Sequence, residues 1–221
     1  MTYILGKVFH KDGTTSDRTY LSYSAMNKWK SNKESYRARY YRGEPDHQNI
    51  EMLYGKFLAQ HLEDGGKIKG LKLYDKSEEA LHVKLGDVEL KGYVDSFDTK
   101  KIRFIEIKSG HLDSKGNSPW SDLKVAKHSQ LVWYYMMLRM KYGKCNPLCH
   151  LIWLETEFKV NSIEYAGHVL TGQSRDLQLT GKIQKFKRKI EEWEVKKLKK
   201  EILIAVQEIH EDYLNYKNQD E

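Results

Sequence analysis

The tetrapeptide Gly92-Tyr93-Val94-Asp95 is followed, eleven residues after the aspartate, by the tripeptide Glu106-Ile107-Lys108. Both lie at the ends of apolar runs that predict consecutive β-strands over residues 88–97 and 102–108. Side chains alternate along a strand, so Glu106 and Lys108 share one face while Ile107 points into the core. The polar side chains of the second strand therefore lie together on one side of the predicted sheet.

The turn between these strands decides whether the two acidic residues meet. With a two-residue turn at Thr99-Lys100, Asp95 lies opposite Phe104 and diagonal to Glu106. Diagonal neighbours are about 7 to 8 Å apart at the backbone, so both carboxylates can reach one ion. A turn longer by one residue would place them on opposite faces.

Two carboxylates and a lysine in this arrangement suit metal-assisted hydrolysis of a phosphodiester. The reaction needs an activated water, neutralised phosphate charge and a stabilised leaving oxygen, all of which divalent ions supply. Asp95, Glu106 and the carbonyl of Ile107 would offer oxygen ligands to one or two Mg²⁺ or Mn²⁺ ions. Lys108 would orient the attacking water or stabilise the phosphate. The alternative is an exposed cross-strand ion pair between Glu106 and Lys108.

A third element, Gln130-Leu131-Val132-Trp133-Tyr134, lies in a segment whose apolar spacing predicts a helix over residues 120–142. Gln130 and Tyr134 are four residues apart and therefore share a helix face. An acidic-x-Lys tripeptide alone is weak evidence, because it recurs elsewhere in this chain. Only Glu106 combines an apolar strand, an aspartate on the preceding strand and a following Gln-x-x-x-Tyr.

Together these motifs resemble the PD-(D/E)XK nuclease superfamily, and the Gln-x-x-x-Tyr element resembles its RecB-like branch. The resemblance covers roughly residues 20–160 and implies an α/β fold with a restriction-endonuclease-like core, a mixed sheet flanked by helices. It implies that Asp95, Glu106 and Lys108 are catalytic. It also implies that Gln130 and Tyr134 support the active site or contact DNA, although Tyr134 packing inward with Gln130 at its rim is the simpler reading.

The same resemblance suggests two more site residues and one absent cofactor. His61 matches the histidine that RecB-like nucleases place on a helix before the sheet, where its nitrogen would favour Mn²⁺; a lone histidine is otherwise often a partly exposed helix-end residue. Ser109 occupies a position near the substrate phosphate. Some family members hold an iron-sulfur cluster through four cysteines, and because only Cys145 and Cys149 are present, we expect no cluster.

The chain is expected to form one nuclease domain over residues 1–221, with a core of about 20–170 and a helical C-terminal extension over 175–217. Met26, Trp29 and Tyr36 lie near helical spacing after Ser24, the expected N-cap, and a capping box at 31–34 restarts the helix. A helix over 49–63 is expected to turn Met52, Phe57 and Leu58 toward the core. Further strands are expected over 80–85, 148–160 and 162–170, and the long C-terminal helix, or pair of helices, over 176–216.

The formal net charge of +7 and a pI of about 9.1 favour a polyanionic partner, although a lysine-rich composition would give the same balance. Arg37, Arg39 and Arg42 alternate with aromatic rings in a pattern that can grip phosphates, and Lys127 is a further candidate. The rings themselves are expected to be core residues. The basic residues between 182 and 200 are expected to be a solvated helix face.

The sequence therefore predicts a metal-dependent DNA nuclease, with exonuclease or end-processing action in recombination, repair or phage DNA metabolism. Single-stranded DNA or free DNA ends are the expected substrates, with a recombination or replication protein or a second copy as further partners. Alternatives are a nucleic-acid-binding or partner-docking module without useful cleavage, and a structure-specific endonuclease. No signal peptide or run of 18 apolar residues occurs, so we expect no membrane contact and a location in the cytoplasm, or the host cytoplasm for a viral protein.

Overall fold

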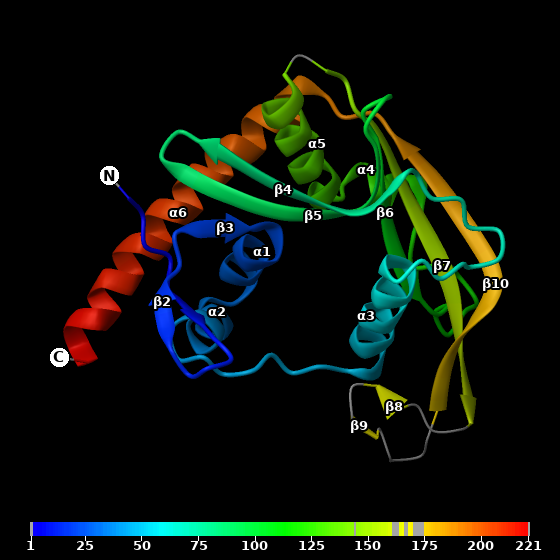
Figure 1. The fold of residues 1–221 in the computed structure, drawn as a ribbon, viewed down its shortest axis with the longest axis horizontal. Helices are drawn as coiled ribbons and strands as arrows, with labels where there is room; N and C mark the ends of the chain where they lie inside the picture. The colour runs from blue at the N-terminus through cyan, green and yellow to red at the C-terminus, as the bar shows by residue number, and fades with distance from the viewer. Residues whose placement is uncertain (1, 144, 161–163, 166–167, 170–174, 221) are drawn as a thin grey trace.

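The computed structural model describes residues 2–143, 145–160, 164–165, 168–169 and 175–220. It confirms the expected class, a mixed sheet flanked by helices with a long C-terminal helix (Figure 1). The helices are α1 (Tyr23–Ser31), α2 (Lys33–Tyr40), α3 (Ile50–Glu63), α4 (Asp122–Ala126), α5 (Ser129–Tyr142) and α6 (Glu192–Asp220). The strands are β1 (Lys7–Phe9), β2 (Thr15–Asp17), β3 (Tyr20–Ser22), β4 (Lys76–Leu85), β5 (Val88–Asp98), β6 (Arg103–Gly110), β7 (Leu148–Val160), β8 (Glu164–Tyr165), β9 (His168–Val169) and β10 (Arg175–Arg188).

The main sheet runs in the order β10-β7-β6-β5-β3, with β4 paired to the other edge of β5. Two pairings, β3 with β5 and β6 with β7, are parallel, whereas the others are antiparallel. In two further small sheets, β1 pairs with β2 and β8 pairs with β9, both antiparallel. The expected strand over 162–170 thus appears as β8 and β9 where it is described, and its remaining residues lie outside the described part.

The connection between β5 and β6 is longer than expected, which corrects the predicted two-residue turn. Phe97 pairs with Phe104 and Asp98 with Arg103, so residues 99–102 form the connection. The Asp98 carboxylate accepts hydrogen bonds from the backbone of Lys100 and Lys101 at 3.0 Å each, which stabilises this longer turn. The shift is by two residues, so continuing this register past Ser96 would place Asp95 opposite Glu106, on the same face as predicted.

One edge of β5 contains a gap in its strand pairing. β3 bonds to this edge over Glu89–Lys91 and β6 bonds over Ser96–Asp98, while β4 occupies the opposite edge. Residues 92–95, the Gly-Tyr-Val-Asp motif, lie between these two ladders. Since β6 continues to pair with β7 as far as Gly110, β5 and β6 separate after Ser96 and leave room between them.

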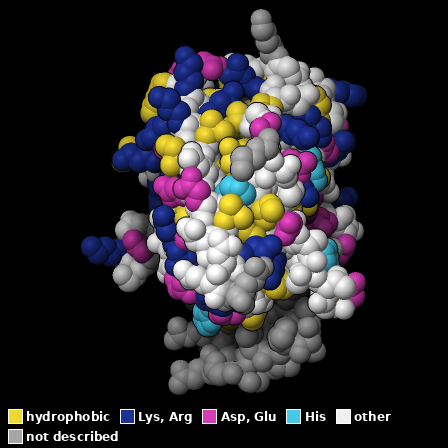
Figure 2. Space-filling view, turned by 90° about the vertical axis from the view of Figure 1, so that its left-hand side faces the viewer, with side chains coloured by type: hydrophobic (Ala, Val, Ile, Leu, Met, Phe, Trp, Pro, Cys, Tyr) yellow, Lys and Arg dark blue, Asp and Glu magenta, His cyan; other side chains and the backbone are white. Residues whose placement is uncertain are grey.

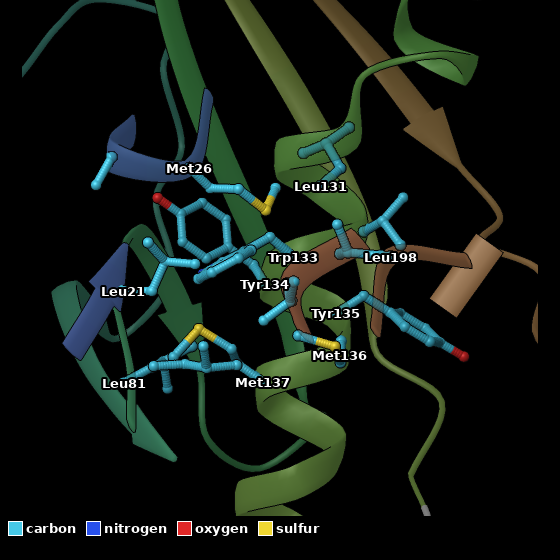
Figure 3. Close-up of a cluster of buried hydrophobic side chains, with 14 of the residues drawn as sticks. Leu21, Met26, Leu81, Leu131, Trp133, Tyr134, Tyr135, Met136, Met137 and Leu198 are labelled. Carbon is cyan, nitrogen blue, oxygen red and sulfur yellow. The ribbon is translucent and has the colours of Figure 1, made fainter. Parts of the chain in front are cut away.

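The helices cover the two faces of the sheet unequally. α3 packs on one face, where Leu58 joins Ile105, Ile152 and Leu154 in a small apolar cluster. The larger cluster lies on the other face and includes α1, α5 and α6. Figure 3 shows side chains from these helices, β3 and β4 meeting around α5. All residues from Leu131 to Leu138 are buried, so α5 is enclosed on all sides, as expected for a helix that crosses a core.

Two helix predictions near α5 require correction. The expected helix over 120–142 is broken between α4 and α5 by His128, whose extended backbone (φ −79°, ψ 98°) caps α5. Leu123, one of the apolar residues within the predicted helix, is 69% exposed. The restart after α1 is confirmed, although the N-caps are Ser22 for α1 and Asn32 for α2. Trp29 and Tyr36 are buried core residues, as expected.

The largest correction concerns residues 175–188, which form the edge strand β10 and not the start of a helix. Ile183 packs in the α3 cluster, whereas Phe186 packs against the larger cluster on the opposite face. Because apolar residues of β10 pack on both faces of the sheet, two of them can be three residues apart, which is the spacing expected of a helix. The strand pairing is also irregular between Leu179 and Ile183. Lys182, Lys185 and Lys187 are exposed on this strand.

Helix α6 itself is confirmed from Glu192 onward, and its apolar stripe is covered by the rest of the chain. Its buried residues, such as Leu198, Ile202 and Ile209, belong to the large cluster, and its start lies beside α5. Among the described residues, no helix is long and apolar enough to cross a membrane.

Gly92 lies on β5 where side chains of α5 pack closely against the strand. A Cβ atom built there would lie 3.0 Å from Tyr134 Cε1 and 3.2 Å from Met137 Sδ. We expect Gly92→Ala to lower the free energy of unfolding by about 1–3 kcal/mol, because added volume in a packed core forces side chains to shift. Thermal denaturation should show a fall of about 2–4 °C for each kcal/mol in a chain of this size.

Gly55→Ala in α3 is the matched control for this substitution. Its Cβ would make only an ordinary contact, 3.7 Å from Ser109 Oγ, and alanine favours a helix interior over glycine. We expect an unchanged or raised melting temperature. Equal losses in both variants would show that the close approach at Gly92 is unimportant.

Candidate active site

A cavity of about 580 Å³ opens beside the gap between β5 and β6. It is bounded by α3 on one side and α5 on the other, with β4, β5 and β6 forming its floor. Residues of the sequence motifs supply much of its lining. These are Asp95, Glu106, Ile107, Lys108, Ser109, Gln130 and Tyr134.

Asp95 is held at the point where the two strands part. Its Oδ2 atom accepts a hydrogen bond of 2.5 Å from the backbone N–H of Ile107. This bond joins β5 to β6 beyond Ser96, where the backbone pairing of the two strands ends. The N–H and C=O of a strand residue leave on the same side, so the Ile107 carbonyl also faces the gap. The structure therefore brings Asp95, Glu106 and the Ile107 carbonyl together, as the sequence predicts.

Glu106 and Lys108 form an ion pair, but it differs from the exposed pair of the alternative reading. Lys108 Nζ lies 2.6 Å from Glu106 Oε1, and the Glu106 side chain is only 2% exposed. The other carboxylate oxygen, Oε2, is buried and has no hydrogen-bond partner among the residues that the structure describes. A buried oxygen without a donor is costly, which marks this atom as one that a bound cation would satisfy.

The cavity raises the pKa of both carboxyl groups. Burial, followed by the negative charge of Glu106, raises the pKa of Asp95 to about 8. Burial also raises the pKa of Glu106, although Lys108 opposes this shift. Burial acts to lower the pKa of Lys108, but the attraction of Glu106 and Asp95 outweighs it and the net shift is upward. Such perturbed groups in a cavity are typical of functional sites.

The donor set suits a hard divalent cation. Two carboxylates and one carbonyl are oxygen ligands, and Mg²⁺ commonly binds through one or two carboxylates while keeping several waters. Within the described residues, no three His, Cys, Asp or Glu side chains are grouped closely enough to hold a metal by themselves. The Glu106 oxygen that lacks a partner among the described residues, and the raised pKa values of the two carboxyl groups, are consistent with a site for a cation. Water and substrate would supply the remaining ligands of that cation.

Gln130 and Tyr134 line the same cavity from α5. Gln130 Nε2 donates to Tyr134 Oη at 3.1 Å. The Tyr134 ring is a core residue, 6% exposed, and contacts Phe104 edge-on. The ring therefore packs inward, as the alternative for this pair expects, and Gln130 and Tyr134 both line the cavity.

Two acidic residues that the sequence did not single out also line the cavity. Glu63 ends α3, and Glu78 lies on β4 where continuing the β4–β5 register would place it opposite Asp95. Glu78 has a φ of +49°, which interrupts this ladder. A hydrogen bond to the Glu63 carboxyl, then burial, raise the pKa of Glu78 to about 7. The position of Glu63 at the end of the predicted helix over 49–63 could have suggested it as a site residue. Nothing in the sequence distinguishes Glu78 as one.

His61 lies apart from this group. Its ring stacks on Phe57, with centroids 6.4 Å apart, and it lines a neighbouring cavity together with Lys67 and Leu179. Glu63, two residues further along α3, takes the place beside the carboxylates. Ser109, by contrast, lines the main cavity as expected.

The predicted DNA-contacting cations lie away from the cavity. Arg37 pairs with Asp212 of α6 at 2.5 Å, Arg42 with Glu34 at 2.7 Å, and Arg39 with Asp46 at 3.9 Å. On the face that carries both chain ends, Lys and Arg side chains stand among Asp and Glu (Figure 2). Lys127 follows α4 and lines a separate groove beside α6. Arg37 therefore has a structural contact that joins α2 to α6.

Comparisons with solved structures agree with this fold. A phage-related exonuclease from Haemophilus somnus 129PT aligns with 97% of this chain and 92% of its own, at 15% identity and a TM-score of 0.51. A candidate exonuclease from Eubacterium rectale aligns with 88% of this chain and 82% of its own, at 9% identity and a TM-score of 0.52. No family model and no curated protein matches the sequence. At such low identity the likeness establishes a shared fold, and that fold is one found in proteins named as nucleases.

Proposed function

We propose that this protein is a metal-dependent DNA nuclease of the RecB-like branch of the PD-(D/E)XK superfamily, acting on DNA ends. One observation carries the proposal: Asp95 and Glu106 line one cavity where β5 and β6 separate, and one buried oxygen of Glu106 has no hydrogen-bond partner among the described residues. Lys108, bonded to the other Glu106 oxygen, completes the set that phosphodiester hydrolysis requires.

The metal would be held by Asp95, Glu106 and the Ile107 carbonyl. Bound there, it would supply Lewis-acid stabilisation of the phosphate and a more acidic water. Since His61 lines another cavity, the donors are all oxygen, which favours Mg²⁺ over softer ions. Lys108 would donate to the attacking water or a phosphate oxygen, and its charge would stabilise the negative charge that develops in the transition state.

The names of the two structural neighbours support exonuclease action over internal cutting. The cavity lies between α3 and α5, a position that suits a strand that enters by its end. Gln130 and Ser109, which line the same cavity as Lys108, would contact the phosphates that flank the scissile bond. A role in recombination, repair or phage DNA metabolism, a protein partner and self-association remain predictions.

The proposal is tested by degradation of end-labelled linear DNA beside a closed circle, in Mg²⁺, Mn²⁺ or EDTA. We expect loss of linear DNA with either metal, none in EDTA, and survival of the circle. Cutting of the circle at the same rate would replace the exonuclease with an endonuclease. Absence of cleavage with tight, salt-sensitive binding would favour the nucleic-acid-binding module.

A further inference from the structure

Helix α3 carries three rings in a row along its outer side. Tyr54, Phe57 and His61 occupy helix positions i, i+3 and i+7, which place them on one face. The ring centroids are 6.0 Å apart for Tyr54 and Phe57 and 6.4 Å for Phe57 and His61. The last two rings are inclined by only 19°. The three side chains thus form a row of neighbouring rings, named here the α3 ring row.

Phe57 is the exposed member of this row, contrary to the core position that the sequence predicts for it, whereas Tyr54 and His61 are half-buried. Phe57 is 44% exposed, and of the apolar residues first expected to face inward only Leu58 is buried. The ring of His61 lies directly over Gly66, where a Cβ atom would be 2.3 Å from the imidazole. Gly66 therefore allows the chain after α3 to pass under the ring and fix its orientation.

The ring row borders a second cavity, of about 420 Å³, between α3 and β10. Lys67 and Lys69, both exposed, line this cavity beside the rings. Leu58 lines both this cavity and the one that contains Asp95 and Glu106. The α3 ring row, its flanking lysines and the candidate active site are therefore neighbours across one helix.

We propose that the α3 ring row is a stacking platform for single-stranded DNA leading to or from the active site. Rings that stack on bases, combined with cations that contact phosphates, are the usual elements of sequence-independent single-strand binding. A duplex hides the faces of its bases, so the surface selects an unpaired strand. The proposal rests on the proposed nuclease function for its purpose and names the substrate class, a single strand or a frayed end.

The test is binding of a fluorescent oligothymidylate in EDTA, where no cleavage occurs, followed by anisotropy. We expect Phe57→Leu to weaken binding about tenfold, because stacking of one base on one ring contributes on that order. Phe57→Trp should keep wild-type affinity, since it retains a ring. Binding of a blunt duplex should be the same for all three proteins.

Trp193→Leu is the matched control, because Trp193 is another exposed aromatic residue, 63% exposed, at the start of α6. Its single-strand affinity should equal that of the wild type. The platform is rejected if Phe57→Leu binds oligothymidylate as tightly as the wild type, or if Trp193→Leu weakens binding equally. Melting temperatures of all variants check that each is folded.

The same variants separate this inference from the nuclease proposal. A wild-type protein that cuts DNA while Phe57→Leu binds normally would leave the nuclease intact and remove the platform. A wild-type protein that never cuts, but whose oligothymidylate affinity depends on the Phe57 ring, would retain the platform and remove the nuclease.

Discussion

Replacing Lys108 with methionine is expected to lower the rate of DNA cleavage at least about 100-fold while the protein stays folded, because one positioned electrostatic contact contributes that much to a transition state. Methionine keeps an unbranched side chain but removes the ammonium that lies 2.6 Å from Glu106. Single-turnover cleavage of end-labelled linear DNA measures the loss.

Lys182→Met is the control for this substitution. Lys182 is exposed on β10 and pairs with Glu155 at 3.2 Å, so its replacement should leave the cleavage rate near the wild-type value. Since Lys108→Met leaves Glu106 buried without its partner, it should also lower the melting temperature of the metal-free protein. Cleavage by Lys108→Met at the wild-type rate would remove this lysine from the mechanism.

Asp95→Asn is expected to abolish cleavage and yet stabilise the metal-free protein. The amide oxygen can still accept the hydrogen bond from Ile107, whereas the charge facing Glu106 is lost. The pKa of Asp95 is raised in the folded protein to about 8 from an ordinary 3.8. The contribution of Asp95 to the free energy of unfolding is therefore most favourable below pH 4, where the carboxyl is neutral, and it is lost as the pH rises through 8 and the carboxyl ionises. The stability gained from asparagine should be largest above pH 8.

Magnesium should reverse the order of the two proteins. A ligand that binds only the folded state raises the free energy of unfolding by about 2.7 kcal/mol at a concentration 100 times its dissociation constant. In a chain of this size, each kcal/mol raises the melting temperature by about 2–4 °C. Wild type should gain this increase and Asp95→Asn should gain little. Melting curves at pH 6 and pH 9, with Mg²⁺ or EDTA, provide the comparison. A magnesium effect equal in both proteins would contradict the ligand role.

The shared face of Asp95 and Glu106 was predictable because it depends on whether the turn changes by an even or an odd number of residues. The connection after Asp98 is two residues longer than the sequence suggests, and a shift of two leaves Asp95 and Glu106 on the same face. A shift of one would have separated them. The sequence could not show the longer turn, because it depends on Asp98 accepting bonds from the backbone that follows.

The errors elsewhere come from apolar spacing that carries no information about what covers each face. Ile183 and Phe186 are three residues apart but pack on opposite faces of β10, so a strand resembles a helix. Phe57 is apolar and lies on a confirmed helix, yet 44% of it is exposed. His61 and Glu63 lie two residues apart, and only the packing of α3 on the sheet determines that Glu63 reaches the cavity.

The lysines of β10 have a consequence for the behaviour of the protein at high concentration. β10 is the last strand of the sheet, and an unpaired strand edge can template the addition of a strand from another molecule. Lys182, Lys185 and Lys187 are exposed along it, so two such edges approaching each other would repel. That repulsion is screened as ionic strength rises, and aggregation through this edge would therefore be promoted by salt.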